Sequence, residues 1–436
     1  MEDSIFPATV DENLALAIRI LLALVIILTM SALCGRLALV VRQPRVLGEM
    51  ISGILLGPTL LGLMWPGSQN ILFPQEVKSV LYVLSTVGLT FYMFLVGVGV
   101  DHGNGDPRGK RATLLAVSGM LPSLLLGAIV GFVSYRELSG SDVTRVEFAL
   151  FLGGALSLTA FPMLARILYE RRLQNSSLGR LALVAASIDD AAAWCLLAVL
   201  LSLHSGAGVW QSLWTIASAG GFVVFMLFGV SRLLHPLGAR VARRGALGYD
   251  GMYTVVIVVL ASGLFTDYIG IYSVFGGFIA GLAMPRDRVF REALHSKMMD
   301  VVSVLLLPIF FAFSGLNTNL LGVVTPTLVL PFVAVLLAGF IGKFFGCALP
   351  MRGFGFSWRE SYAVGGLMNA RGLMILIFVN IGLSQGLITQ GLFSVLVLVA
   401  VVTTAVAMPI YRYALPEWLE SGISHRPESP VLDQVA

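Results

Sequence analysis

Apolar stretches of 18 or more residues recur along almost the whole chain, and they limit what it can fold into. Each is long enough to cross about 30 Å of hydrocarbon as an α-helix. Charged residues make up only 12% of the 436 residues, against about 25% in a soluble domain. A water-soluble fold of this length has too little polar sequence to cover so much apolar surface. The sequence therefore predicts an all-α protein that crosses a membrane many times.

The hydropathy pattern predicts about 13 transmembrane spans. Their expected residues are 14–34, 46–63, 79–100, 113–133, 148–168, 179–203, 211–233, 251–266, 270–284, 299–316, 327–349, 360–382 and 390–411. Two of these spans, 251–266 and 270–284, are short, so counts of 12 or 11 stay open.

The distribution of Lys and Arg predicts the orientation of the chain. With the N-terminus outside, the inside loops hold most basic residues, and the outside loops hold only Lys78, Arg136 and Arg145. This asymmetry follows the positive-inside rule. The basic residues behind the net charge of +4 therefore lie in loops next to the membrane, and no nucleic-acid partner is expected. We expect a cell membrane protein, in a bacterial inner membrane, with a cytoplasmic C-terminus.

Two pairs of short strings indicate an internal repeat. Residues 46–53 (VLGEMISG) resemble residues 274–281 (VFGGFIAG), and residues 94–99 resemble residues 310–315. Spans 1–6 then match spans 8–13, and span 7 is a linker helix. An offset of seven helices makes the two six-helix repeats run in opposite directions, as in many secondary transporters with a site near the midplane. The alternative is a chance likeness between glycine-rich apolar helices.

Few ionisable residues lie in mid-span, where a charge costs about 2.5 kcal/mol or more, and four of them are the clearest. They are Asp189 and Asp190 in one span, and Lys343 and Arg371 in two others. Adjacent carboxylates on a helix point about 100° apart, so one can face an ion path while the other meets a counter-charge, for which Lys343 is the natural candidate. The free carboxylate can bind a proton or a hard cation, which prefers oxygen ligands. The alternative is an ion-pair network that only locks helices together.

Two spans contain sequence breaks at equivalent places of the repeat. The residues concerned are Ser157, Thr159, Phe161 and Pro162 in the first, and Asn369, Arg371 and Gly372 in the second. Pro162 removes a backbone donor, and unwound backbone at membrane depth is tolerated where it lines a cavity or is buried in protein. Crossed breaks direct half-helix ends at one point, where Arg371 or Thr159 can offset their dipoles. Ser157 and Thr159 are further candidates for ion or proton binding, and Arg371 alternatively ties helices together.

These motifs resemble those of the monovalent cation:proton antiporter-2 family, which includes Kef-type systems, plant cation/proton exchangers and bacterial sodium/proton antiporters. The resemblance covers nearly all spans in order. It rests on four strings, which are residues 48–58, residues 158–168, residues 179–183 followed by Asp189-Asp190, and residues 367–372. The resemblance implies exchange of a monovalent cation, Na+ or K+, for protons, without enzymatic activity and without a cofactor.

The resemblance also implies a homodimer of 13-helix protomers in lipid, with an inverted repeat and an elevator-type alternating-access mechanism. It assigns scaffold helices to 1–100 and 235–320, transport-core helices to 101–204 and 321–412, a linker helix to 205–234, and a short cytoplasmic tail to 413–436. Asp190 carries the ion and the proton in this scheme, while Asp189 pairs with Lys343.

Two other transport functions stay open. One is a Kef-like potassium efflux system, and the other is a proton-coupled exporter of an organic solute. Kef-type members and plant exchangers usually carry a large cytosolic C-terminal domain, whereas this sequence ends at Ala436, so we expect a bare exchanger. A membrane sensor without transport activity is a third reading, against which the adjacent acids argue.

Overall fold

The computed structural model describes residues 11–99, 108–140, 143–170, 173, 176–204, 208–270, 272–320, 323 and 326–416. Within these residues the chain is helical and forms no β-sheet. A single isolated bridge joins Ser139 to Ile388.

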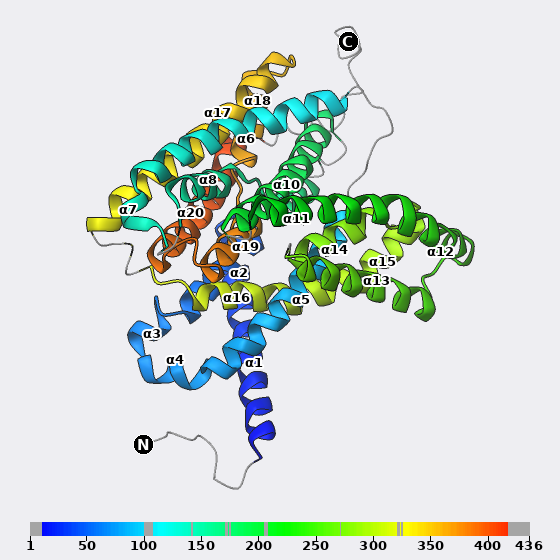
Figure 1. Cartoon of the computed structure of the whole chain (residues 1–436), viewed down its shortest axis with the longest axis horizontal. Helices are drawn as coiled ribbons and strands as arrows, with labels where there is room; N and C mark the ends of the chain where they lie inside the picture. Colours follow the sequence, from blue (N-terminus) through cyan, green and yellow to red (C-terminus); the bar gives the residue numbers. More distant parts are fainter. Residues whose placement is uncertain are drawn as a thin grey trace. The chain divides into compact units, whose positions relative to one another are not determined.

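The helices follow one another along the chain, and Figure 1 labels most of them. Those before the centre of the sequence are α1 (Glu12–Val40), α2 (Arg45–Leu56), α3 (Leu61–Met64), α4 (Pro66–Leu72), α5 (Gln75–Gly99), α6 (Arg108–Val133), α7 (Tyr135–Leu138), α8 (Arg145–Ser157), α9 (Phe161–Glu170) and α10 (Ser177–His204). Those that follow are α11 (Gly208–Val224), the π-helical turn η1 (Phe225–Val230), α12 (Ser231–Arg244), α13 (Tyr249–Tyr268), α14 (Ser273–Leu282), α15 (Arg288–Val301), the π-helical turn η2 (Val302–Leu306), α16 (Leu307–Leu316), α17 (Pro326–Gly353), α18 (Trp358–Leu367), α19 (Gly372–Ser384) and α20 (Gln390–Ala414).

Ten helical segments of the described chain are long and apolar enough to cross a membrane. The chain is therefore a multi-pass membrane protein. Helix occupies most of each of the 13 expected spans, but three of these spans are not among the ten. One is α14, which has only 10 residues, and the other two are interrupted between α8 and α9 and between α18 and α19. The count of 13 transmembrane helices stays a prediction.

Two helices extend beyond the apolar residues that define their expected spans. The expected span 211–233 continues as helix to Arg244, and the expected span 299–316 is preceded by helix from Arg288 onward. The side chain of Asp287 accepts a hydrogen bond of 3.1 Å from the Phe290 amide and so caps the start of α15. Hydropathy detects only the apolar part of such a helix, because the charged continuation suits water rather than hydrocarbon.

The chain divides into two compact units. Unit 1 comprises Met1–Ala38, Gly48–Val100 and Ala207–Thr318, and unit 2 comprises Leu39–Leu47, Asp101–Gly206 and Asn319–Ala436. Each unit thus combines segments from both halves of the sequence. The expected linker over 205–234 lies, where it is described, in unit 1. The roles expected for scaffold and core in transport stay predictions.

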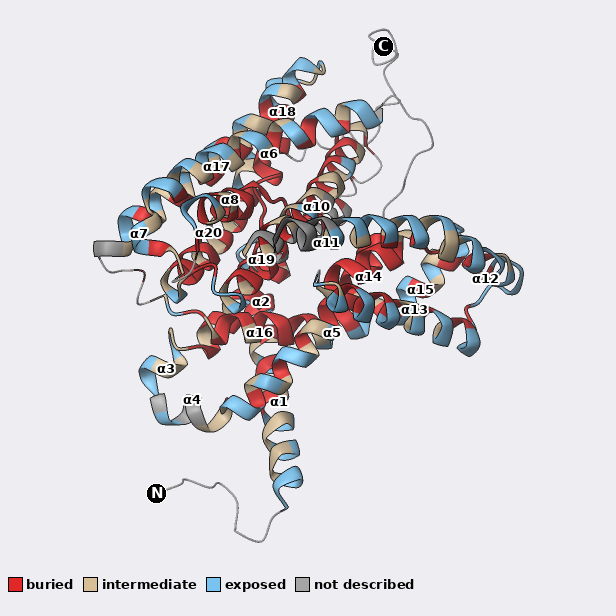
Figure 2. Cartoon of the chain, viewed as in Figure 1, coloured by how far each residue is buried: buried red, intermediate tan, exposed pale blue. Residues whose placement is uncertain are grey.

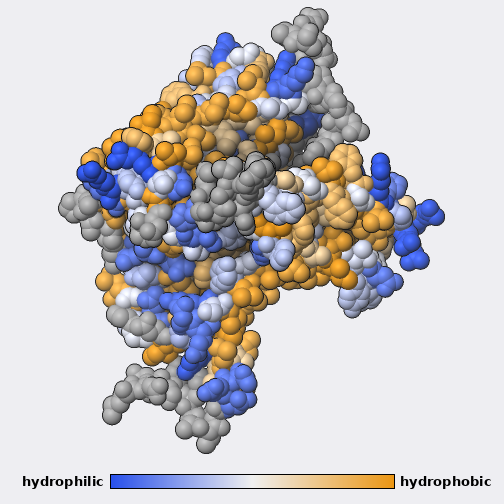
Figure 3. All heavy atoms as spheres, viewed as in Figure 1, coloured by the Kyte–Doolittle hydropathy of each residue, from blue (hydrophilic) through white to orange (hydrophobic). Residues whose placement is uncertain are grey.

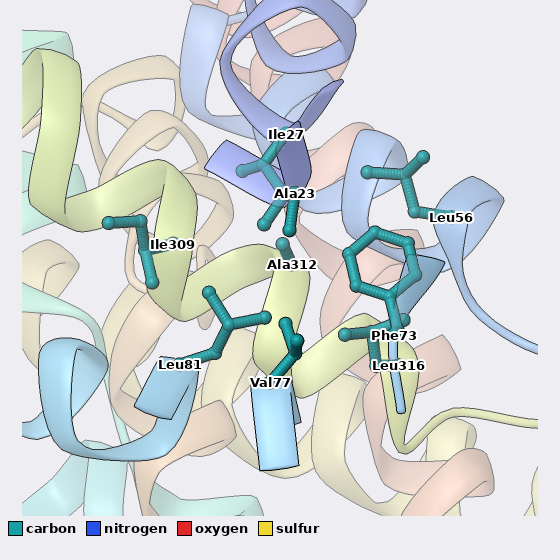
Figure 4. Close-up of a cluster of buried hydrophobic side chains, with 9 residues drawn as sticks. All are labelled: Ala23, Ile27, Leu56, Phe73, Val77, Leu81, Ile309, Ala312 and Leu316. Atoms are coloured by element: carbon teal, nitrogen blue, oxygen red, sulfur yellow. The ribbon is translucent and has the colours of Figure 1, made fainter. Parts of the chain in front are cut away.

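The interior of unit 1 is built from α1, α2, α5 and α16, together with Phe73 after α4. Figure 4 shows nine buried apolar side chains converging there: Ala23, Ile27, Leu56, Phe73, Val77, Leu81, Ile309, Ala312 and Leu316. Lipid tails are as apolar as these side chains, so exclusion of water alone does not hold helices together in a membrane. Close van der Waals packing between the helices stabilises the cluster instead.

Glycines let two pairs of helices in unit 1 approach backbone to backbone. A Cβ on Gly315 of α16 would lie 1.9 Å from the carbonyl carbon of Gly53 on α2. A Cβ on Gly281 of α14 would lie 2.2 Å from the carbonyl oxygen of Phe94 on α5. Such small-residue contacts are typical of membrane helices. Gly53 and Gly281 occupy the same position in the two repeated strings, so each string provides a glycine at a helix crossing.

Large apolar side chains cover the exposed faces of the long helices. Figure 2 shows exposed surface along α1, α12 and α13, and the exposed side chains there include Leu21, Leu233 and Tyr268, at 63%, 77% and 88% exposure. Much of the face seen in Figure 3 is hydrophobic. Monomeric soluble proteins rarely expose so much contiguous apolar surface, whereas a helix that faces lipid does.

Loop contacts hold one end of unit 2 together. The Thr144 side chain and Glu147 form a capping box at the start of α8, and the Leu138 carbonyl accepts a 3.2 Å hydrogen bond from the Thr389 hydroxyl at the start of α20. His204 at the end of α10 contacts the Gln385 carbonyl at 3.0 Å. These contacts connect α7 to the start of α20 and the end of α10 to the end of α19.

The backbone contact between Gly53 and Gly315 is directly testable. We expect Gly315→Ala to lower the melting temperature in detergent, because the new Cβ overlaps the backbone of α2 and overpacking costs about 1–3 kcal/mol. Gly220→Ala is the matched control, since Gly220 also lies within a helix and a Cβ there meets nothing within 4 Å. Equal melting temperatures for the two variants would contradict the contact.

Candidate ion-binding site

Two helices of unit 2 are interrupted in mid-course, and their breaks contact each other. Residues 158–160 separate α8 from α9, and residues 368–371 separate α18 from α19. The Ala160 amide donates a 3.1 Å hydrogen bond to the Ala370 carbonyl. The Thr159 hydroxyl lies 3.1 Å from the Met368 carbonyl, which can accept its proton. Buried unwound backbone needs such partners because no water is available to satisfy it.

The residues that were expected to be unwound do not all lie within the two breaks. Asn369 lies within the second break, whereas Phe161, Pro162 and Gly372 belong to the first turns of the half-helices that follow. The break therefore precedes Pro162, because proline is well suited to a first helical turn, where its missing N–H needs no partner. Gly372 has φ 39°, in the left-handed region that favours glycine.

Asp189 and Lys343 form the buried ion pair that the sequence interpretation expected. The Lys343 ammonium lies 2.5 Å from Oδ2 of Asp189, and the two side chains are 0% and 1% exposed. Lys343 also donates to the Ser157 carbonyl at 2.7 Å. Removing one member of the pair would leave the other charge buried without compensation, which is more costly than removing both.

Thr159 and Ser157, both expected to bind the ion or the proton, contact this pair in different ways. The Thr159 hydroxyl lies 2.8 Å from Oδ2 of Asp189 and 3.1 Å from the Met368 carbonyl. Its single proton can serve only one of these acceptors at a time. The Ser157 hydroxyl donates to the Gly154 carbonyl within its own helix at 2.8 Å, so Ser157 reaches the pair through its backbone carbonyl.

Asp190 lies next to Asp189 on α10 and is 1% exposed. Neither of its carboxylate oxygens has a hydrogen-bond partner among the described residues. The backbone amide of Phe161, at the start of α9, is close enough to act on the carboxylate as a donor, although it does not form a full hydrogen bond with either oxygen. The positive end of a helix favours an anion there. An ionised carboxylate buried without a partner is costly. Asp190 is therefore suited to hold either a proton or a cation.

Arg371, expected to compensate charge, is fully buried and contacts backbone carbonyls. Its Nη2 donates to the Gly339 carbonyl of α17 at 2.6 Å, and its Nη1 donates to the Ala155 carbonyl at 3.4 Å. Arg371 forms no ion pair with a described residue. Ala155 lies in the last turn of α8, where carbonyl dipoles favour a cation. These contacts connect the second break to α8 and α17.

Two residues of this site escaped the sequence analysis. Gly339 leaves room for Arg371, because a Cβ on Gly339 would lie 2.8 Å from Nη2 of Arg371. Thr404 of α20 is 1% exposed, and its hydroxyl accepts a 3.2 Å hydrogen bond from the Gly372 amide. The adjacent threonines 403 and 404 within an otherwise apolar span were the available signal.

The apolar helices, the contacting breaks and the buried charges are typical of a multi-pass membrane transporter, and the relatives described next are transporters rather than enzymes. The profile of the transmembrane sodium/hydrogen exchanger family matches residues 21–411, and the chain belongs to this family. The expected membership of the monovalent cation:proton antiporters is thereby confirmed at the level of the family.

Curated relatives are similar over most of the chain. The Na+/H+ antiporter NhaS4 of Synechocystis sp. is 36% identical over 401 residues, covering 92% of this chain and 97% of that protein. Cation/H+ antiporter 17 of Arabidopsis thaliana is 36% identical and covers 90% of this chain and 48% of its own length. K+/H+ antiporter 1 of Saccharomyces cerevisiae is 29% identical, with 91% and 46% coverage. The chain thus spans about half the length of these plant and yeast relatives.

A solved structure has the same fold. The sodium–proton antiporter MjNhaP1 from Methanocaldococcus jannaschii superposes with a TM-score of 0.66 over 94% of this chain and 100% of that one, at 14% identity. At this identity the likeness concerns the helical architecture alone.

The buried ion pair predicts that removing one of its two charges destabilises the protein more than removing both. We expect Lys343→Met to destabilise the protein by about 3–5 kcal/mol, because it leaves Asp189 charged and uncompensated. Adding Asp189→Asn should recover much of this loss, since both charges are then absent. Melting temperatures in detergent of Lys343→Met, of Asp189→Asn and of the double variant measure both effects. Wild-type stability of Lys343→Met would show that the pair contributes nothing.

Proposed function

We propose that this protein is a secondary active transporter that exchanges a monovalent cation, Na+ or K+, for protons at Asp190. Its relatives named above are Na+/H+, K+/H+ and cation/H+ antiporters. One structural observation carries the proposal further: Asp190 is buried, and both of its carboxylate oxygens are without hydrogen-bond partners among the described residues. The neighbouring Asp189 is already paired with Lys343.

This difference between the two carboxylates gives each a separate role. Asp189 is neutralised by Lys343 and receives the Thr159 hydroxyl as well, so its charge is compensated whether or not a cation is bound. Asp190 has no such compensation and must obtain it from its ligand. A proton neutralises the carboxylate directly, and a hard cation neutralises it through oxygen coordination. Proton and cation therefore compete for one carboxylate.

Competition at Asp190 couples the two fluxes. Moving the ionised, unoccupied carboxylate through a low-dielectric environment is costly, so the site changes its exposure only when it holds a proton or a cation. Neither gradient can then dissipate without the other. The transported Na+ or K+ and the protons are substrates, and no cofactor takes part in this scheme.

The architecture we propose has 13 transmembrane helices in two inverted six-helix repeats joined by a linker helix. Three observations support it: helix in every expected span, contacting breaks in spans 5 and 12, and repeat-equivalent glycines at the α2–α16 and α14–α5 crossings. The division into two units supports a scaffold (1–100 and 235–320) and a transport core (101–204 and 321–412).

In this proposal, unit 2 carries the ion and moves as an elevator, while unit 1 forms the scaffold of a homodimer. All the ionisable residues of the candidate site, Asp189, Asp190, Lys343 and Arg371, belong to unit 2, so the site can move as one body. We place the protein in a bacterial inner membrane, with its N-terminus outside and its C-terminus in the cytoplasm, because this orientation satisfies the positive-inside rule.

Exchange by purified protein in liposomes tests the function. With an imposed pH gradient and a pH-sensitive dye, addition of Na+ or K+ should collapse the gradient. Asp190→Asn should reduce the response to that of protein-free liposomes, because the amide can neither ionise nor exchange a proton. Asp250→Asn, at an exposed acid in the first turn of α13, is the matched control and should exchange normally.

The other outcomes separate the competing functions. Retained exchange in Asp190→Asn, with folding verified by size-exclusion chromatography, would remove Asp190 from the mechanism. Downhill K+ flux without proton movement would favour a potassium efflux system. Protection of cells from a toxic organic compound, without any cation-dependent proton flux, would favour organic-solute export.

A further inference from the structure

The first amides of the two half-helices α9 and α19 face polar side chains on different helices. The amide of Phe161, first in α9, faces the carboxylate of Asp190 on α10. The amide of Gly372, first in α19, donates a 3.2 Å hydrogen bond to the hydroxyl of Thr404 on α20. In the proposed repeat, α9 corresponds to α19 and α10 to α20. Thr404 therefore occupies, in the second proposed repeat, the position that Asp190 occupies in the first.

The Thr404 hydroxyl bonds to a different helix, whereas the hydroxyl of the adjacent Thr403 bonds within its own helix. Thr403 donates its hydroxyl proton to the Val399 carbonyl of its own helix at 2.8 Å, a common arrangement within helices. Thr404 instead accepts from a different helix. Gly372 has no other way to pair its amide within an α-helix, because the first amides of a helix have no intrahelical partner.

A short path connects Thr404 to the amide that faces Asp190. Gly372 lies against the start of α9, since a Cβ placed on it would be 3.6 Å from the Cβ of Ala160 and 3.5 Å from that of Met163. Two residues before Gly372, the Ala370 carbonyl accepts a 3.1 Å hydrogen bond from the Ala160 amide. The next amide along the chain is that of Phe161. The position of α19 therefore influences where the Phe161 amide points.

We propose that Thr404 is a positioning residue of the cation site: by accepting the Gly372 amide it holds the two breaks in register, so that the Phe161 amide faces Asp190. The inference rests on the function proposed above. Because the hydroxyl is neutral, it pairs the first amide of the second half-helix without placing there a second carboxylate that could attract a cation.

The electrostatic consequence sets the direction of the expected effect. An amide that faces a carboxylate favours the ionised form over the protonated form. If the Phe161 amide turns away, protons compete better for Asp190, and more cation is needed for the same exchange rate. Asp189 and Lys343 are charged side chains that act on Asp190, and both are unchanged by a substitution at Thr404.

The test compares hydroxyl-bearing and hydroxyl-free side chains at this position in proteoliposomes. We expect Thr404→Val to raise the half-saturating cation concentration about three- to tenfold, the effect of losing one buried hydrogen bond, with a maximal rate within about twofold of wild type. The rise should be largest at acidic pH, where protons compete, and should shrink at alkaline pH. Thr404→Ser retains the acceptor and should restore the wild-type value.

Thr403→Val is the matched control, because it removes a hydroxyl that bonds only within α20 and should leave the half-saturating concentration unchanged. A purely structural role for Thr404 would lower the melting temperature and the yield of active protein without a pH-dependent change in half-saturation. If Thr404→Val does not fold, Thr404→Cys provides a weaker acceptor of similar size and should give an intermediate value.

The outcomes separate this inference from the proposed function. Wild-type protein that shows no cation-dependent proton movement defeats the proposed function. If the wild-type protein exchanges, but Thr404→Val or Thr404→Cys has the wild-type half-saturating cation concentration at every pH, the proposed role of Thr404 is wrong while the proposed function stands. Equal effects of the Thr403 and Thr404 variants would overturn it as well.

Discussion

The architecture of unit 2 depends on one constraint, which is that a charge cannot be buried far from water without a partner. Four charged side chains and several half-helix ends lie in its interior. Lys343 neutralises Asp189, and Arg371 lies against carbonyls near the end of α8. The helix breaks supply the remaining partners, because unwinding frees amides and carbonyls that can be directed at these groups. Of these four charged side chains, Asp190 is the one whose carboxylate oxygens have no hydrogen-bond partner among the described residues, and the proposed exchange requires one such group.

The same constraint explains how much of the site could be predicted from sequence. An acid or a base in an apolar span is rare because it is costly, so Asp189, Asp190, Lys343 and Arg371 were recognisable at once. Charge alone predicted that Lys343 pairs with one of the two aspartates, and the family resemblance assigned that role to Asp189; this pair is present. Neutral groups carry no comparable signal: a hydroxyl in a membrane helix usually bonds to its own backbone, as that of Ser157 does. The different use of Thr404 depends on which helix lies opposite, and that information exists only in three dimensions.

Predictions of the fold divide along similar lines. Long apolar helices were recognisable, because length and hydropathy measure their fit to a bilayer directly. The predicted helix ends were less accurate where the helix contains charged residues, as near Arg244 and Arg288. There the sequence stops being apolar before the helix itself ends. Packing partners could not be predicted from composition, since helices that pack in lipid are selected by fine steric fit. The crossing of Gly53 with Gly315 requires both glycines to face each other, and either one alone resembles many glycines of the chain.

The inverted repeat proposed above would give unit 2 two comparable half-helix ends, yet the proposed exchange at one carboxylate needs only one of them to bind a cation. The two amides at these ends are chemically alike, so the difference between them lies in what faces them. Asp190 offers the Phe161 amide a carboxylate, which in the proposed mechanism is neutralised by a proton or a cation. Thr404 offers the Gly372 amide a neutral acceptor that is complete without a ligand. In this proposal a symmetric backbone supports an asymmetric site, because the difference between a carboxylate and a hydroxyl decides which half-helix binds the ion and which one supports the other.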